Sequence, residues 1–175
     1  MATLRPSDSN ALPDDAEVPG TTGEGSPTEV AATLLLCDSA QSIGGKLYLL
    51  GGGWSILSWS GPDAKFNVAL AIKLAIPWSQ ANERMEVLAR LATEDGEPVQ
   101  PEGQPIEVRG EIEVGRPAGL RPGTPLDVPL AMNINNLPLT PGGYRWELLV
   151  GGRPVARQPF QVVDRRQTAG PHQPG

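Results

Sequence analysis

The sequence contains very few of the side chains on which most catalytic and metal sites depend. Among its 175 residues there is one histidine, His172, and one cysteine, Cys37. We expect His172 to lie in a disordered tail, which excludes Ser–His catalysis, Cys–His catalysis and most zinc sites from the folded part. A single cysteine excludes an internal disulfide and suits a reducing compartment. Cys37 follows the apolar residues 34–36 and is interpreted as a small buried hydrophobe.

Long apolar runs and clustered positive charge are missing as well. No run reaches the roughly 18 residues of a membrane-spanning helix, and the first residues contain no apolar core of a signal peptide. The net charge is −6, and the folded part has no basic footprint of the kind that nucleic acids or anionic membranes require. We therefore expect a cytoplasmic protein that contacts neither nucleic acid nor membrane.

Glycine and proline, in contrast, are plentiful. The chain has 21 glycines and 19 prolines, about twice the usual share. Residues 1–29 form an acidic segment rich in Pro, Gly and Ser, and residues 165–175 form a second polar segment. Neither holds enough large apolar groups to offset the entropy of ordering it, so both are predicted to be disordered tails. One folded domain is expected between them, over residues 30–164.

Apolar and polar residues alternate with a period of two through this domain. In segment 105–115, for example, Ile106, Val108 and Ile112 fall on one face, and glutamates and an arginine fall on the other. This period is typical of strands with one wet face. The segments expected to form strands are 32–37, 46–58 (with a possible break), 66–76, 84–91, 105–115, 126–134, 143–150 and 154–163. They predict an all-β fold, an antiparallel two-sheet β-sandwich of seven to nine strands.

Two local features refine this prediction. Pro129 cannot donate a ladder hydrogen bond, so segment 126–134 should be an edge strand or carry a bulge. The run 139–146 resembles the tyrosine corner of immunoglobulin-like sandwiches, in which a tyrosine hydroxyl bonds backbone a few residues upstream. We therefore expect an immunoglobulin-like sandwich with Tyr144 as the corner residue and Trp146 in the core.

Two patterns suggest ligand sites but have simpler explanations. The glycines 51–53 follow a strand, as in a phosphate-binding loop, but the next residues are β-like rather than helical, so a bulge or a close backbone approach is favoured. Five acidic residues have the chemistry of calcium ligands, but their spacing resembles no calcium loop and favours turn and cap roles. These residues are Asp38, Asp63, Glu94, Asp95 and Asp127.

Several apolar residues fall on faces that the alternation assigns to water. Ala69, Ala71 and Ala75 make the outward side of segment 66–76 small and dry, and Leu88 and Leu149 also point to the wet side. A large apolar patch usually marks an interface. We expect this side to be covered by a partner chain, by an identical subunit, or by a loop of the same chain.

Three further residues are candidates for a binding surface. Trp59 and Trp78 stand near Gly, Ser and Pro, and loop tryptophans stack on sugars or anchor protein partners. Arg116 lies in the polar loop 115–117, for which a strand-ending turn is the alternative interpretation.

A set of short motifs resembles an uncharacterised bacterial family of small β-sandwich domains. The motifs are Gly-Gly-Gly-Trp at 51–54, Pro-Trp at 77–78, Glu-Val-Gly-Arg-Pro at 113–117, Pro-Leu-Asp-Val-Pro-Leu-Ala at 125–131 and Pro-Gly-Gly-Tyr-Arg-Trp-Glu-Leu at 141–148. The resemblance spans about residues 33–163. It implies a domain without an assigned activity and adds no catalytic residues.

These observations favour a non-enzymatic binding or protein-interaction module, with no catalytic residue, cofactor or metal. A carbohydrate or small-ligand binder that uses the loop tryptophans is the alternative. A carboxylate-based or metal-assisted hydrolase is a third hypothesis, and it requires three or more Asp or Glu residues to converge at one loop end. The sequence names no partner, and a homodimer remains one option.

Overall fold

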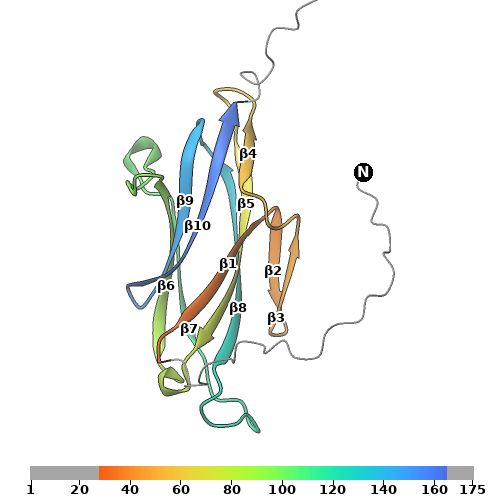
Figure 1. Cartoon of the computed structure of the whole chain (residues 1–175), viewed down its shortest axis with the longest axis vertical. Coiled ribbons are helices and arrows are strands. Elements are labelled where there is room, and N and C mark those ends of the chain that lie inside the picture. Colours follow the sequence, from red (N-terminus) through yellow and green to blue (C-terminus); the bar gives the residue numbers. More distant parts are fainter. Residues whose placement is uncertain (1–27, 165–175) are drawn as a thin grey trace, which may run out of the picture.

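The computed structural model describes residues 28–164, and this part of the chain is all-β, with no α-helix (Figure 1). Ten strands follow one another along the chain: β1 (Ala31–Cys37), β2 (Ser39–Ile43), β3 (Lys46–Leu50), β4 (Ile56–Trp59), β5 (Phe66–Ile76), β6 (Arg84–Thr93), β7 (Glu107–Glu113), β8 (Leu126–Leu137), β9 (Gly142–Val150) and β10 (Arg153–Asp164). Two single 3₁₀ turns interrupt them, η1 (Trp78–Gln80) and η2 (Pro101–Gly103). The tails predicted to be disordered, apart from residues 28 and 29, lie outside the described residues.

The strands form three sheets. A three-stranded sheet has the order β1-β5-β8, a five-stranded sheet has the order β4-β10-β9-β6-β7, and β2 pairs with β3 in a hairpin. The count of ten exceeds the predicted seven to nine for two reasons. The glycines 51–53 divide segment 46–58 into two strands, and the polar segment of β2 showed no apolar alternation from which a strand could be predicted.

One strand pair departs from the prediction that all pairing is antiparallel. Strand β4 runs parallel to β10, with Ile56 opposite Gln161 and Trp59 opposite Asp164. Parallel strands need a long connection between them. Here most of the domain lies between β4 and β10 in sequence and makes that connection, so no crossover helix is required.

The main hydrophobic core lies between the three-stranded and five-stranded sheets. It takes Leu70 and Ile72 from β5, Val87 from β6 and Leu148 from β9, with Trp146 fully buried as predicted. Tyr144 also takes its predicted role, because its hydroxyl donates a hydrogen bond of 2.9 Å to the Thr140 backbone oxygen. Burial of these side chains on one face of each strand is the main favourable contribution to folding.

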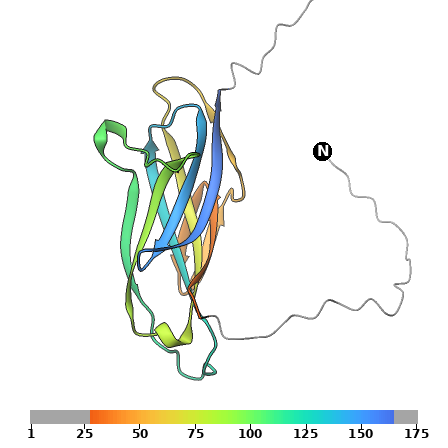
Figure 2. The same ribbon diagram turned by 60° about the vertical axis from the view of Figure 1, so that its left-hand side comes forward.

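The edge position of β8 agrees with the prediction from its proline. Strand β8, which contains Pro129, pairs only with β5 and is therefore an edge strand, as expected. The connecting loops gather at the two ends of the long strands (Figure 2). The loop around η1 and the loop before β8 lie at one end, and the loop that contains η2 lies at the other.

Candidate interaction surface

The hairpin of β2 and β3 covers the outer side of the three-stranded sheet (Figure 1). Ala69 and Ala71 are buried beneath it in a small second core, together with Cys37 and Ala40. Neither alanine therefore belongs to an exposed interaction surface, which corrects the prediction made for them. A segment of the same chain thus covers these two alanines, which was one of the three expected covers, whereas Ala75 on the same side is half-buried. Cys37 is fully buried, as interpreted from its apolar neighbours.

Side-chain hydrogen bonds fix the hairpin on the sheet. The Asn133 amide on β8 accepts a hydrogen bond from the Ala40 backbone N–H at 3.2 Å and donates one to the Ala40 carbonyl at 2.9 Å. The Ser42 hydroxyl donates to the Pro129 carbonyl at 2.8 Å. Asn133 thus satisfies two backbone groups of an edge strand in place of a neighbouring strand, and it sets the position of β2 against β8.

The glycine-rich turn brings the hairpin close to β1. Gly51 has a φ of +59°, which favours glycine, and a Cβ on Gly52 would lie 2.6 Å from Leu49 Cδ1 and 3.2 Å from Leu35 Cδ2. The Gly53 N–H then donates to the Leu36 carbonyl at 2.9 Å. This is the close backbone approach that the sequence favoured over a phosphate-binding loop.

The outward side of the hairpin is apolar at its centre. We call it the hairpin face; it is formed by Ser39, Gln41 and Ile43 of β2 and by Lys46, Tyr48 and Leu50 of β3. The exposed fractions are 54% for Tyr48, 72% for Leu50 and 58% for Ile43. A hollow of about 550 Å³ lies along the two strands and is lined by residues of both faces, including Leu49 and Leu50. Lys46 is the only charged residue on this face, so a partner meets mainly apolar and neutral groups.

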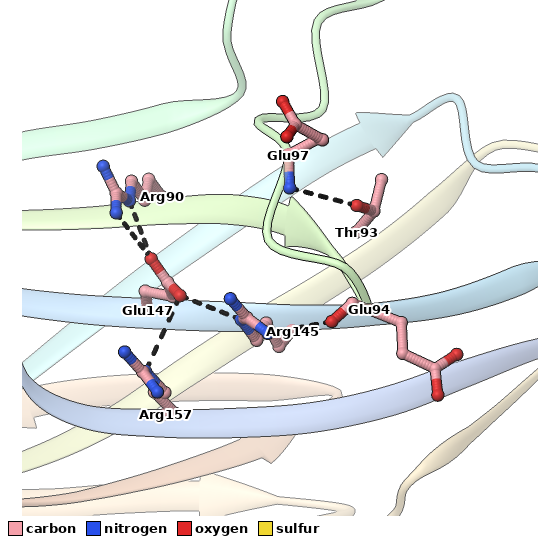
Figure 3. Close-up of polar contacts among 7 residues, drawn as sticks. All are labelled: Arg90, Thr93, Glu94, Glu97, Arg145, Glu147 and Arg157. Atoms are coloured by element: carbon pink, nitrogen blue, oxygen red, sulfur yellow. Dashed lines mark hydrogen bonds and ion pairs between the residues drawn. The ribbon is translucent and has the colours of Figure 1, made fainter.

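A second unusual feature lies on the outer side of the five-stranded sheet (Figure 3). Glu147 is only 4% exposed, although its side chain points away from the main core. Its carboxylate accepts hydrogen bonds from Arg90 Nε at 2.9 Å and Arg145 Nε at 2.8 Å, and Arg157 Nε lies 3.6 Å away. Burial raises the pKa of Glu147, but the hydrogen bonds from Arg90 and Arg145 outweigh it, and the pKa lies below its usual value.

The sequence did not reveal this cluster because Glu147 follows the ordinary alternation of a wet face. Its burial depends on arginines from three neighbouring strands, which meet only through the register of β6, β9 and β10. Arg145 also donates to the Glu94 carbonyl at 2.9 Å and so ties the cluster to the turn after β6. We interpret the cluster as structural, because both carboxylate oxygens and most of the facing donors are already engaged.

A family model covers the part of the chain that forms these strands. The model of a family of unknown function, DUF6941, matches residues 32–163, which is the part of the chain from β1 to β10. The chain belongs to this family. No curated protein matches the chain. The resemblance to an uncharacterised domain is therefore confirmed, whereas a bacterial distribution stays a prediction.

The leucines predicted on the outer side of the DUF6941 domain do lie there. Leu88 and Leu149 are cross-strand neighbours on β6 and β9, and each is half-buried. Arg109 stands opposite Leu88 on β7 and makes ion pairs with Glu86 and Glu107. The two leucines thus form a small apolar spot among charged side chains, much less exposed than the hairpin face.

The two tryptophans predicted as binding residues pack mainly against other residues of the DUF6941 domain. Trp59 and Trp78 are half-buried and pack against the main core. The Arg116 guanidinium carbon lies 5.1 Å from the centroid of the Trp78 ring, and Arg116 Nη2 donates to the Trp78 carbonyl at 3.3 Å. Arg116 therefore covers one face of Trp78 and fixes the end of the domain where both lie.

A groove of about 510 Å³ lies where β4, β9 and β10 meet. Gly143 leaves a gap in the sheet, and the Glu94 side chain packs against it. Ile56 is 60% exposed at this groove. Tyr144 and Phe160 border it, but Phe160 is only 2% exposed, and its ring stacks on that of Tyr144 against the main core, with the ring centroids 5.6 Å apart.

The described residues offer little for metal chemistry. Within residues 28–164, no group of three or more His, Cys, Asp or Glu side chains is placed to hold a metal ion. The convergence of carboxylates that the hydrolase hypothesis requires is therefore not met in this range. No helix in the same range is long and apolar enough to cross a membrane.

Proposed function

We propose that this DUF6941 domain is a non-enzymatic protein-interaction module and that a protein partner docks on its β2–β3 hairpin. One observation carries the proposal. The large apolar side chains that the described residues leave exposed are Ile43, Tyr48, Leu49, Leu50 and Ile56, and four of these five belong to the hairpin. A concentration of exposed apolar side chains on one element is typical of interaction sites.

The energetics favour a docking role for the hairpin face. Burying a whole leucine side chain contributes about 1.5–3 kcal/mol, so the exposed part of Leu50 alone offers roughly 1–2 kcal/mol to a partner. Tyr48 adds an aromatic surface with a polar tip, a residue type enriched at binding hot spots. The hairpin is fixed by Asn133 and Ser42, so docking costs little ordering entropy.

A scaffold role is consistent with the rest of the domain. We propose that the two larger sheets form an immunoglobulin-like sandwich, which the tyrosine corner at Tyr144 and the shared core between the sheets support. In such folds, function resides on surfaces added to the scaffold rather than in its core. Here the added element is the hairpin on the outer side of the smaller sheet.

The test compares two substitutions of equal charge at two exposed apolar sites. Tyr48→Glu places a carboxylate on the hairpin face, and Ile56→Glu places one at the groove on β4. Affinity capture and an amine-reactive cross-linker are applied to the wild type and to both variants. We expect cross-links at Lys46 on the hairpin face, and we expect Tyr48→Glu, but not Ile56→Glu, to abolish capture. Equal capture by the wild type and Tyr48→Glu would remove the proposal.

The groove at Gly143 supports a second candidate, the binding of a small ligand such as a carbohydrate. Its volume and the exposed Ile56 side chain at its edge fit a compact ligand. Trp54 contacts Phe160 edge to face, with centroids 6.3 Å apart, and so provides a fluorescent reporter. A glycan array and tryptophan fluorescence test this candidate, and Ile56→Glu should abolish any response. A response that persists in Ile56→Glu would place the ligand elsewhere.

A further inference from the structure

Strand β3 exposes apolar side chains on both of its faces. Tyr48 and Leu50 point outward, whereas Leu49 points inward towards Leu35 and Gly52 and is still 38% exposed. A partner that lies flat on the hairpin face covers Tyr48 and Leu50 but does not reach Leu49. A strand added beside β3 covers all three, because side chains of neighbouring strands flank one another on both faces of a sheet.

The free edge of β3 has few of the features that prevent strand addition. It belongs to a two-stranded sheet and pairs only with β2. Among the other edge strands of the domain, β8 contains Pro129, and β7 carries alternating glutamates and an arginine along its outer side, whereas β1, β2 and β4 contain neither proline nor charge. Prolines and charges of this kind block edge-to-edge pairing. Strand β3 has no proline, and its single charge, Lys46, is at its first position.

We propose that β3 pairs antiparallel with β3 of a second copy of this chain, about a twofold axis at Tyr48, so that two hairpins form one four-stranded sheet. This inference rests on the proposed function and names the partner as the chain itself. In this register Tyr48 faces Tyr48 of the second copy, Lys46 faces Leu50, and Leu47 faces Leu49. Such an interface is closed, because each copy offers the same surface to the other.

The register is favourable in each row of the sheet. On the inner side, Leu47 of the second copy lies beside Leu49 and covers its exposed part. On the outer side, the two tyrosines form an aromatic cross-strand pair. The two lysines lie at opposite ends of the paired strands, about 13 Å apart at roughly 3.3 Å per residue, which exceeds the Debye length of about 8 Å at physiological salt. No like charges therefore face each other.

The size of the contact determines how the dimer should behave. A pair of five-residue strands is a small interface of the kind found in weak or transient complexes. The contacts are apolar, whereas the whole chain carries a net charge of −6 that makes two copies repel. We therefore expect a reversible dimer that forms at high micromolar concentration and that becomes stronger, not weaker, as salt screens the repulsion.

Sedimentation velocity of the full chain is the first test. The mass of 18.5 kDa should double with rising concentration. Tyr48→Lys and Tyr48→Glu should each be monomeric, because each places like charges at the twofold axis, and an equimolar mixture of the two should recover the dimer. Tyr48 is exposed, so both variants are expected to fold, and unfolding curves that match the wild type confirm this.

Position 50 tests the register independently. In the proposed register Leu50 faces Lys46 of the second copy, so Leu50→Glu should keep the dimer and Leu50→Lys should abolish it. On oxidation, Tyr48→Cys should form a disulfide between the two copies, because position 48 faces position 48 of the second copy. Lys46→Cys should not, because the two positions 46 lie at opposite ends of the paired strands. Cys37 is fully buried and does not compete in this assay.

The results separate this inference from the proposed function. A chain that stays monomeric up to about millimolar concentration, or a dimer that both Tyr48 variants leave intact, overturns the inference. If the chain is monomeric and its Tyr48→Glu variant no longer captures a different protein that the wild type captures, the inference is overturned and the proposed function stands. Recovery of the dimer only in the Tyr48→Lys and Tyr48→Glu mixture, with the disulfide at position 48, supports both.

Discussion

Removal of the buried charge in Glu147→Gln should destabilise the domain by about 2 kcal/mol at pH 7. Loss of one partner from a buried ion pair typically costs about 3–5 kcal/mol. The cost is smaller here because the arginine side chains reach water, with exposed fractions of 44% for Arg90 and 61% for Arg157. For a domain of this size, 2 kcal/mol lowers the Tm by roughly 6–10 °C. Urea unfolding followed by circular dichroism measures the difference.

The pH dependence gives this prediction a second, independent test. The pKa of Glu147 is lower in the folded state than in the unfolded chain, so its contribution to stability is complete above the unfolded pKa of about 4.3. It is lost as the pH falls through the folded pKa. The gap between wild type and Glu147→Gln should therefore be full at pH 7 and close below about pH 4.

A matched control separates burial from charge. Glu111 lies on the same sheet, its side chain is 67% exposed, and its ion pair with Arg84 is 3.9 Å long. Glu111→Gln should change stability by at most about 0.5 kcal/mol. The reasoning is refuted if Glu147→Gln unfolds at the wild-type urea concentration, or if its deficit is as large at pH 3 as at pH 7.

Three further predictions concern the tyrosine corner, the small second core and the hairpin. Tyr144→Phe removes the hydrogen bond to the Thr140 carbonyl and should cost about 1 kcal/mol in urea unfolding; an unchanged midpoint would show that the corner contributes nothing. Burial, and then the nearby Asp38, raise the pKa of the Cys37 thiol, so it should resist a thiol reagent at pH 8 in the folded protein and react at once in urea; fast native labelling would contradict its burial. Asn133→Ala leaves the Ala40 backbone groups unpaired and should speed amide exchange in β2 while β9 stays protected; equal protection in β2 would refute the anchoring role.

Much of the fold could be predicted because it depends on local patterns. Period-two alternation identified the strand segments 66–76, 84–91, 105–115 and 126–134, and the inability of proline to donate placed Pro129 on an edge. Tyr144 could be assigned to a corner because its hydrogen bond spans only four residues. In each case the physical cause lies within one segment, so the sequence of that segment is sufficient.

The candidate interaction surface was predicted less well. The sequence predicted correctly that Ala69 and Ala71 are shielded from water. Which segment covers them depends on how β2 and β3 fold back across β5 and β8. Once the chain's own hairpin covers those alanines, the exposed apolar surface moves to Tyr48 and Leu50. Segment 46–57 carries apolar side chains on both of its faces, but this pattern does not distinguish a second core from a free surface.

The sequence by itself determined that the chain forms strands with one wet and one dry face, where Pro129 could lie, and that histidine and thiol chemistry are scarce. Only the tertiary structure decided the parallel pairing of β4 with β10, the burial of Glu147 among three arginines, and the position of the hairpin. The physical reason is the distance along the chain between the residues that interact. Alternation and turn chemistry act between near neighbours, whereas these three features join residues far apart in the chain, and their register is set only when the whole core packs.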